Sequence, residues 1–212
     1  FIGGAPYNAD GGNSSGHARV YEWNDTSNPP QWQQLGPDID GTAGAASGDT
    51  VSMNNDGSRV AVGEMSYNGG SGRVRIYDWN PAGNGGAGSW DSHTLNNPGA
   101  GATYFGFAVS LNSSGNRVAI GDRMYNSAKG RALIYENSSG TTWTEVGNIY
   151  PALSSRFAEK LEINDDGNVL IVGAPYTNKG VVQVYENTSG TTWSQIGNDI
   201  TGSATGSPLC GY

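Results

Sequence analysis

Short apolar runs recur along this chain and define its pattern of buried positions. Each run is apolar at consecutive residues, which is typical of a strand buried on both faces. After each run comes a segment that alternates apolar and polar residues, the pattern of a second strand. In the second copy, the alternation predicts that Val74 and Ile76 face one way and Tyr77 the other. The runs occupy residues 1–4, 60–63, 118–121 and 170–173.

Two further elements complete the repeat. In three of the four copies another apolar segment precedes the run, and an Asn-x-x-Gly turn joins the two, at residues 54–57, 112–115 and 164–167. Asparagine and glycine adopt the left-handed conformations of tight turns, so each turn predicts a β-hairpin. Beyond the alternating segment of every copy lies one tryptophan: Trp32, Trp90, Trp143 and Trp193. Each repeat therefore predicts four short strands in a meander.

The spacing of the repeats predicts the fold class. The equivalent tyrosines Tyr21, Tyr77, Tyr135 and Tyr185 are 56, 58 and 50 residues apart. Four strands in a unit of this length predict an all-β protein, a β-propeller or propeller segment built of four-stranded antiparallel meander blades. A β-solenoid is the second choice, because its rungs are usually shorter. We divide the single repeat domain into residues 1–46, 47–104, 105–156 and 157–212.

The sequence begins and stops partway through a repeat, so we expect strand edges without a partner. The first repeat lacks its first strand, and the sequence stops where a further first strand would begin. Two alternatives follow: the chain is a piece of a longer array, or its last segment pairs beside the first strand and closes a ring. Unpaired strand edges bind other strands. We therefore expect partners among other protein chains or copies of this chain.

Composition and charge exclude several function classes. Glycine supplies 34 of 212 residues, and hydrophobic residues make up 35%, which suits many turns and short strands. The net charge is −8 and no cluster of lysine and arginine stands out, so nucleic acid is not an expected partner. No apolar run is long enough to cross a membrane.

The repeats resemble FG-GAP repeats, the blades of integrin-α-type β-propellers. They are most similar to a subgroup common in marine microbes and algae, whose units read like VSLNSDGNRVAIGAPYN. Phe105-Gly106 matches the FG motif, and residues 4–6 and 173–175 match the GAP motif. The resemblance implies propeller blades and an extracellular or cell-surface protein. Family blades often carry a calcium loop between their first two strands. The turns here are too short for one, so we predict neither metal nor cofactor.

Few residues suit catalysis. Glu64 and Asp122 occupy equivalent positions in neighbouring repeats, and paired carboxylates can serve glycoside hydrolysis. Loop-end charges satisfied by solvent or by Arg123 are the simpler interpretation. The only histidines, His17 and His93, are predicted on strand surfaces. We therefore predict a protein that is not an enzyme. The alternative is a polysaccharide-active propeller enzyme or a carbohydrate-binding, lectin-like propeller.

Several residues are candidates for contacts and modification. The tryptophan found once per repeat predicts packing between blades, whereas Trp23 and Trp79 occur in only two repeats and are candidates for exposed contacts. Cys210, the single cysteine, is a free thiol or a link to another chain. Five Asn-x-Ser/Thr sequons are candidate glycosylation sites if the protein is secreted by a eukaryote. They are Asn13, Asn24, Asn112, Asn137 and Asn187, of which the last two share a turn position that we expect to be exposed.

Together these features predict a non-enzymatic extracellular or cell-surface module with a binding or structural role. Adhesion, with glycans among its ligands, and service as a scaffold subunit of a surface assembly or filament are both compatible with the sequence.

Overall fold

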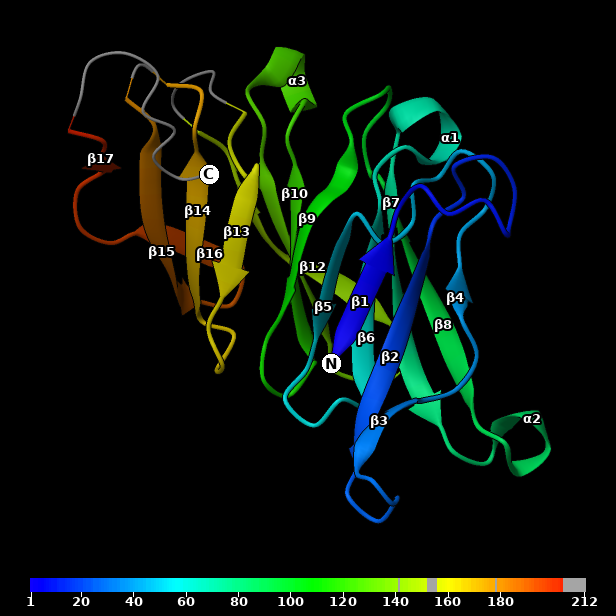
Figure 1. The fold of residues 1–212 in the computed structure, drawn as a ribbon. Helices are drawn as coiled ribbons and strands as arrows, with labels where there is room; N and C mark the ends of the chain where they lie inside the picture. Colours follow the sequence, from blue (N-terminus) through cyan, green and yellow to red (C-terminus); the bar gives the residue numbers. More distant parts are fainter. Residues whose placement is uncertain (141, 152–155, 178, 204–212) are drawn as a thin grey trace.

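Four antiparallel sheets follow one another along the chain in the computed structural model, which describes residues 1–140, 142–151, 156–177 and 179–203 (Figure 1). We number them blades 1 to 4. Blade 1 contains β1 (Ile2–Ala5), β2 (His17–Asn24), β3 (Gln31–Gln34) and β4 (Ile39–Asp40). In Figure 1, blade 4 lies at the left of the array and blades 1 and 2 lie at the right.

The other three blades each begin with an inner strand that blade 1 lacks. Blade 2 contains β5 (Thr50–Met53), β6 (Arg59–Glu64), β7 (Arg73–Asn80) and β8 (Ser89–Asn96). Blade 3 contains β9 (Phe105–Leu111), β10 (Arg117–Asp122), β11 (Ala132–Asn137) and β12 (Trp143–Ile149). Blade 4 contains β13 (Lys160–Ile163), β14 (Val169–Ala174), β15 (Val181–Ser189), β16 (Thr192–Gln195) and β17 (Ile200–Thr201). Tight turns with left-handed residues at their centres form the segments labelled α1 (Tyr67–Gly70), α2 (Gly83–Gly86) and α3 (Tyr125–Ala128).

Each sheet is an up-and-down meander, and the predicted all-β, blade-like fold is confirmed. The predicted hairpin turns are present, because the amides of Gly57, Gly115 and Gly167 donate to the carbonyls of Asn54, Asn112 and Asn164. The outer strand is continuous in blades 2 and 3 but broken in the other two. In blade 1 a bulge separates β3 from β4, and both pair with β2. In blade 4 a bulge likewise separates β16 from β17, and both pair with β15.

The apolar core lies between neighbouring blades. Three clusters of buried side chains join blade 1 to blade 2, blade 2 to blade 3, and blade 3 to blade 4. The predicted alternation of β7 is confirmed, because Val74 and Ile76 join the cluster with blade 3 and Tyr77 joins the cluster with blade 1, and all three are buried. A middle strand of a stacked blade is covered on both faces, so alternation no longer separates core from solvent.

Glycines allow the blades to approach closely at three points. Isolated parallel bridges join Gly16 to Ser47, Gly72 to Phe105 and Gly130 to Phe157. At Gly130 the backbone φ is +81°, and a Cβ there would lie 2.2 Å from the carbonyl oxygen of Phe157. Only glycine fits such a position.

Among the described residues, the structure contains no helix with the length and apolar character needed to cross a membrane.

Candidate functional site

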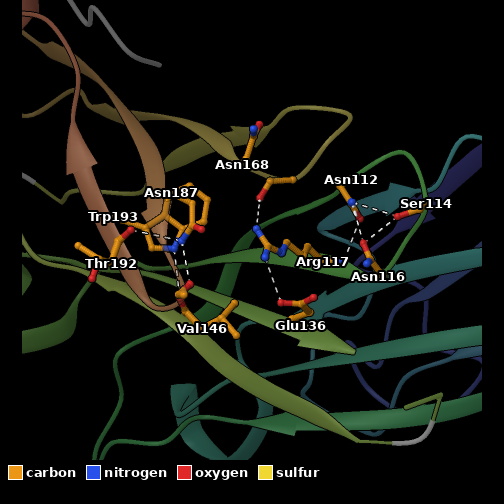
Figure 2. A network of polar contacts seen from close by, with 12 residues as sticks. Asn112, Ser114, Asn116, Arg117, Glu136, Val146, Asn168, Asn187, Thr192 and Trp193 are labelled. Carbon is orange, nitrogen blue, oxygen red and sulfur yellow. Dashed lines mark hydrogen bonds and ion pairs between the residues drawn. The ribbon is translucent and has the colours of Figure 1, made fainter. Parts of the chain in front are cut away.

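An arginine side chain in each of blades 2 and 3 donates to the hairpin turn at the start of the following blade. Arg117 Nη1 donates to the Gly167 carbonyl of blade 4 at 2.9 Å, and its Nη2 donates to Glu136 within blade 3 at 3.1 Å (Figure 2). Arg59 repeats both contacts one blade earlier, with Gly115 and Asp78. We did not predict this clamp, although the arginines stand in register in the sequence.

A polar cavity of about 390 Å³ lies beside this clamp, between the first hairpin turns of blades 3 and 4. Its lining comprises Asn112, Ser113, Ser114, Asn116, Asp165 and Asp166. The Ser113 amide donates to the Asp165 carbonyl at 3.2 Å, so backbone pairing also joins these turns. The network holds the turn ends of the blades in fixed positions.

Two of the candidate glycosylation sites are buried. The Asn112 side chain is 3% exposed, and its amide nitrogen donates to Ser114 and Asn116 (Figure 2). Asn137 is 6% exposed, with a buried amide nitrogen, so the expectation that its turn position is exposed is wrong. Packing against the neighbouring blade covers positions that look like loop tips in the sequence.

The other three sequons remain candidates. Asn13 lies on an exposed loop, and Asn24 is half-buried at the end of β2. Asn187 is also half-buried, and its amide nitrogen donates to the carbonyls of Gly190 and Thr192 (Figure 2).

The paired carboxylates lie in the interior, each held by arginine of its own blade. Glu64 forms ion pairs with Arg73 and Arg75, and Asp122 forms one with Arg131. Both carboxylates are fully buried. Burial raises the pKa of Asp122, while hydrogen bonds from Thr103 and Arg131 act in the opposite direction. The arrangement supports a structural role, because the arginines take up the charges that a glycosidase would direct at its substrate.

The two histidines lie in different surroundings. His93 is half-buried and its Nε2 lies 3.3 Å from Asp78. His17 is only 6% exposed, so its predicted surface position is wrong. A ring nitrogen of His17 and one carboxylate oxygen each of Asp38 and Asp40 lie within 4.8 Å of one another. These groups are of the kinds that bind a metal ion.

Most of the tryptophans found once per repeat pack between blades, as predicted. Trp90 Nε1 donates to the Leu35 carbonyl of blade 1 at 3.1 Å. Trp193 Nε1 likewise donates to the Val146 carbonyl of blade 3 at 3.1 Å (Figure 2). Trp143 packs against the cluster between blades 2 and 3. Trp32 packs against no neighbouring blade among the described residues, and it is 53% exposed.

The two extra tryptophans have different environments. Trp23 is 52% exposed, as expected for a contact residue. Trp79 is half-buried and packs on Trp90 and on the Gly36 backbone, where a Cβ would lie 2.5 Å from its ring. The expectation of an exposed Trp79 is therefore wrong, because blade 1 covers it.

Blade 1 presents an aromatic surface formed by the exposed Phe1, Trp23 and Trp32 and the half-buried Tyr21. The Phe1 ring stacks on Tyr21 at 5.0 Å, and Trp32 meets Phe1 and Trp23 edge to face. The cluster borders a cavity of about 230 Å³ that also includes Glu22 and Asp56. It is the largest group of exposed aromatic rings among the described residues.

Comparison with known proteins identifies the fold. No protein-family model matches the chain, and no curated protein matches its sequence. Among solved structures, a Bacteroides fragilis protein provisionally named a 6-phosphogluconolactonase has a TM-score of 0.62 at 17% identity, over 92% of this chain and 53% of its own. A chain of a nidogen/laminin complex has a TM-score of 0.53 at 9% identity, over 92% of this chain and 60% of its own.

A third similar structure is a complex of Atg21 with the coiled coil of Atg16, with a TM-score of 0.51 at 11% identity, over 89% of this chain and 66% of the other. The chain thus spans about half to two thirds of the length of these proteins. The similarities and the blade topology place the chain in the β-propeller class.

The prediction that the chain is not an enzyme is contradicted, because a protein named for an enzymatic activity has this fold. A blade array of this kind is compatible with catalysis. At 17% identity the similarity concerns the fold and transfers no catalytic residue. Cys210, proposed as a free or linking thiol, lies outside the described residues.

Proposed function

We propose that this chain is a structural and protein-binding module that assembles with other copies of itself through the outward faces of blades 1 and 4. The observation that carries the proposal is the exposed aromatic surface of blade 1. Its residues Trp23 and Trp32 occupy the positions that Trp79 and Trp90 occupy in blade 2, where they are covered by blade 1.

The contact of Trp79 and Trp90 with blade 1 shows the kind of surface that we expect Trp23 and Trp32 to bind. Both rings lie against the Leu35-Gly36 bulge, where the Leu35 amide donates to Val20 and its carbonyl accepts from Trp90. The glycine has a φ of +73° and leaves room for the Trp79 ring. Trp193 makes the same contact with Val146 and Gly147.

Blade 4 carries the matching bulge on its outward face. The Ile196 amide donates to Val184 as the Leu35 amide does to Val20, and Gly197 has a φ of +71°. Ile196 is 43% exposed. A second copy that placed Trp23 and Trp32 on this bulge would repeat the interface between blades 1 and 2. Such a contact joins two different surfaces, so it is head-to-tail and forms a ring or a filament.

Sedimentation velocity over a range of protein concentrations tests the proposal on residues 1–212. Self-association is expected for the wild type, and both Trp32→Ala and Ile196→Asp should be monomeric when alone. An equimolar mixture of the two variants should form dimers, because each keeps one intact face. Tyr7→Ala, at a 79% exposed loop position, is the control and should behave as wild type.

Two results would overturn the proposal. One is a wild type that stays monomeric up to its solubility limit. The other is self-association that survives in Trp32→Ala. Circular dichroism of each variant separates lost binding from lost folding.

The finer assignments made from the sequence are proposals that accompany this one. We infer an FG-GAP-like repeat, supported by the full burial of Phe105 and by the φ of +86° at Gly106, where the motif needs glycine. A sequence profile built from relatives of the chain should then align integrin-type blades in register.

We also propose an extracellular or cell-surface location. Glycopeptide mass spectra of native material that show sugar on Asn13, Asn24 or Asn187 would support it, and unmodified peptides from a eukaryotic source would count against it.

A further inference from the structure

We infer that His17, Asp38 and Asp40 form a binding site for one divalent transition-metal ion of the Zn²⁺ type on blade 1. The inference is independent of the self-assembly proposed above. His17 begins β2 and Asp40 ends β4, and the two are directly opposite partners in the antiparallel pair. Asp38 precedes Asp40 by two residues and pairs with the Arg19 side chain of β2.

The geometry brings three ligand atoms together. A nitrogen of His17 and one oxygen from each carboxylate lie within 4.8 Å of one another. Imidazole nitrogen with carboxylate oxygens is a donor set that suits Zn²⁺ and related ions, whereas Ca²⁺ prefers oxygen alone. Three protein ligands leave a further position for water or for a group from a partner.

An independent observation concerns the His17 ring. The side chain is 6% exposed, and its buried Nδ1 has no hydrogen-bond partner. A buried polar atom without a partner destabilises the folded state, so such atoms are rare unless another ligand satisfies them. A metal ion bound at this nitrogen would supply that partner.

The other blades show that the cluster is peculiar to blade 1. The position of His17 is Arg73 in blade 2, which pairs with Asn96, and Val181 in blade 4, which pairs with Thr201. Blade 4 keeps a counterpart of Asp38 in Asp199, which accepts from Gln183 and Gln195 as Asp38 accepts from Arg19 and Gln34, but this blade has no histidine at the position of His17. The repeat alone therefore does not require the three ligands.

Nearby arginines balance the charge of the carboxylates at and beside the site. Arg19 donates to both oxygens of Asp38 at 2.7 to 3.0 Å, which holds the pKa of this carboxyl below its usual range. Gln34 Nε2 also donates to Asp38 Oδ1 at 2.7 Å, so each oxygen of Asp38 accepts two hydrogen bonds and a bound metal ion would replace one of them. Arg75 donates to the Asp40 backbone carbonyl and shares the Glu64 carboxylate with Arg73. The carboxylates of Asp38, Asp40 and Glu64 thus balance the guanidiniums of Arg19, Arg73 and Arg75.

Titration of residues 1–212 with ZnCl₂ after treatment with EDTA tests the site. Nitrogen-15 NMR of the imidazoles is the direct readout, because the chain has only two histidines. Saturable Zn²⁺ binding should shift the His17 ring signals and leave those of His93 in place. Calorimetry should give one equivalent, and His17→Gln should weaken binding by at least about 10-fold.

Asp40→Asn is the second variant, because its exposed side chain makes misfolding improbable as an explanation. It should also weaken Zn²⁺ binding by about 10-fold. His93→Gln and Asp199→Asn are matched controls at a histidine and an aspartate outside the cluster, and both should bind as wild type. A His17 ring that does not respond to Zn²⁺, or an affinity unchanged in Asp40→Asn, would overturn the inference.

Discussion

At the scale of single residues, the repeats provide natural substitutions at one position. Asp122 and Arg131 are a buried ion pair in blade 3, and Arg131 also lies over the Tyr125 ring at 3.8 Å. The equivalent pair in blade 4 is Ala174 and Val181, which are opposite partners in β14 and β15. The same backbone therefore accepts either a charged or an apolar pair.

This comparison predicts the outcome of a double substitution. Arg131→Val alone leaves a buried carboxylate without its partner and should lower the free energy of unfolding by about 3 kcal/mol. Adding Asp122→Ala should recover roughly half of that loss, since the unpaired charge is gone. Urea unfolding at neutral pH measures both. A double variant no more stable than Arg131→Val would contradict the structural role given to this pair.

A second residue-scale prediction concerns acid stability. The Arg19 guanidinium lowers the pKa of Asp38 in the folded state below 3.8, its value in the unfolded chain. The carboxylate therefore stabilises the fold above pH 3.8, and this contribution is lost as the pH falls through the lower, folded-state pKa.

Asp38→Asn should accordingly be less stable than wild type at pH 7, with a difference that disappears in acid. The effect should be small, because the pair is partly solvated. Thermal unfolding in EDTA across this pH range measures it without any metal contribution. A difference that stays constant down to pH 2 would show that the charge of Asp38 is not the cause.

At the scale of strands and turns, the sequence predicts features that depend on neighbouring residues in the chain. It does not predict features that depend on contacts between blades. The turn from Asn54 to Gly57 was predicted, because its hydrogen bonds lie within four residues. The burial of Tyr77 was not, because it depends on packing against Ala18 and Val20 of the neighbouring blade. The repeated Arg59 and Arg117 were visible in the sequence, but their carbonyl partners lie in the next blade.

The close joints between blades lead to a prediction about glycine. Gly130→Ala should destabilise the protein more than Gly69→Ala, although both residues have positive φ. At Gly69 no atom lies within 4 Å of a built Cβ, so the change costs only the left-handed conformation, about 1–2 kcal/mol. At Gly130 the Phe157 carbonyl must also move, which disturbs the bridge between blades 3 and 4. Equal losses in urea unfolding would show that the bridge adds nothing.

At the scale of the whole molecule, each blade is stabilised mainly by its neighbours, as in other repeat proteins. The clusters that join successive blades contain most of the buried apolar side chains. Blades 1 and 4 each have one neighbour among the described residues. Their outward faces hold exposed large apolar side chains, including Trp23, Trp32, Ile196 and Ile200.

The stability of the molecule should therefore depend on protein concentration. If a second copy covers the blade 1 face, mass action stabilises the folded state, and the Tm of residues 1–212 should rise as the chain is concentrated. Trp32→Ala removes the ring that contacts the second copy and should give a Tm that does not change with concentration. Tyr7→Ala, on a loop away from this face, should keep the wild-type dependence. Calorimetric scans at several concentrations measure the effect. A wild-type Tm that stays constant, or rises equally in Trp32→Ala, would mean that the aromatic surface of blade 1 stabilises no contact between copies.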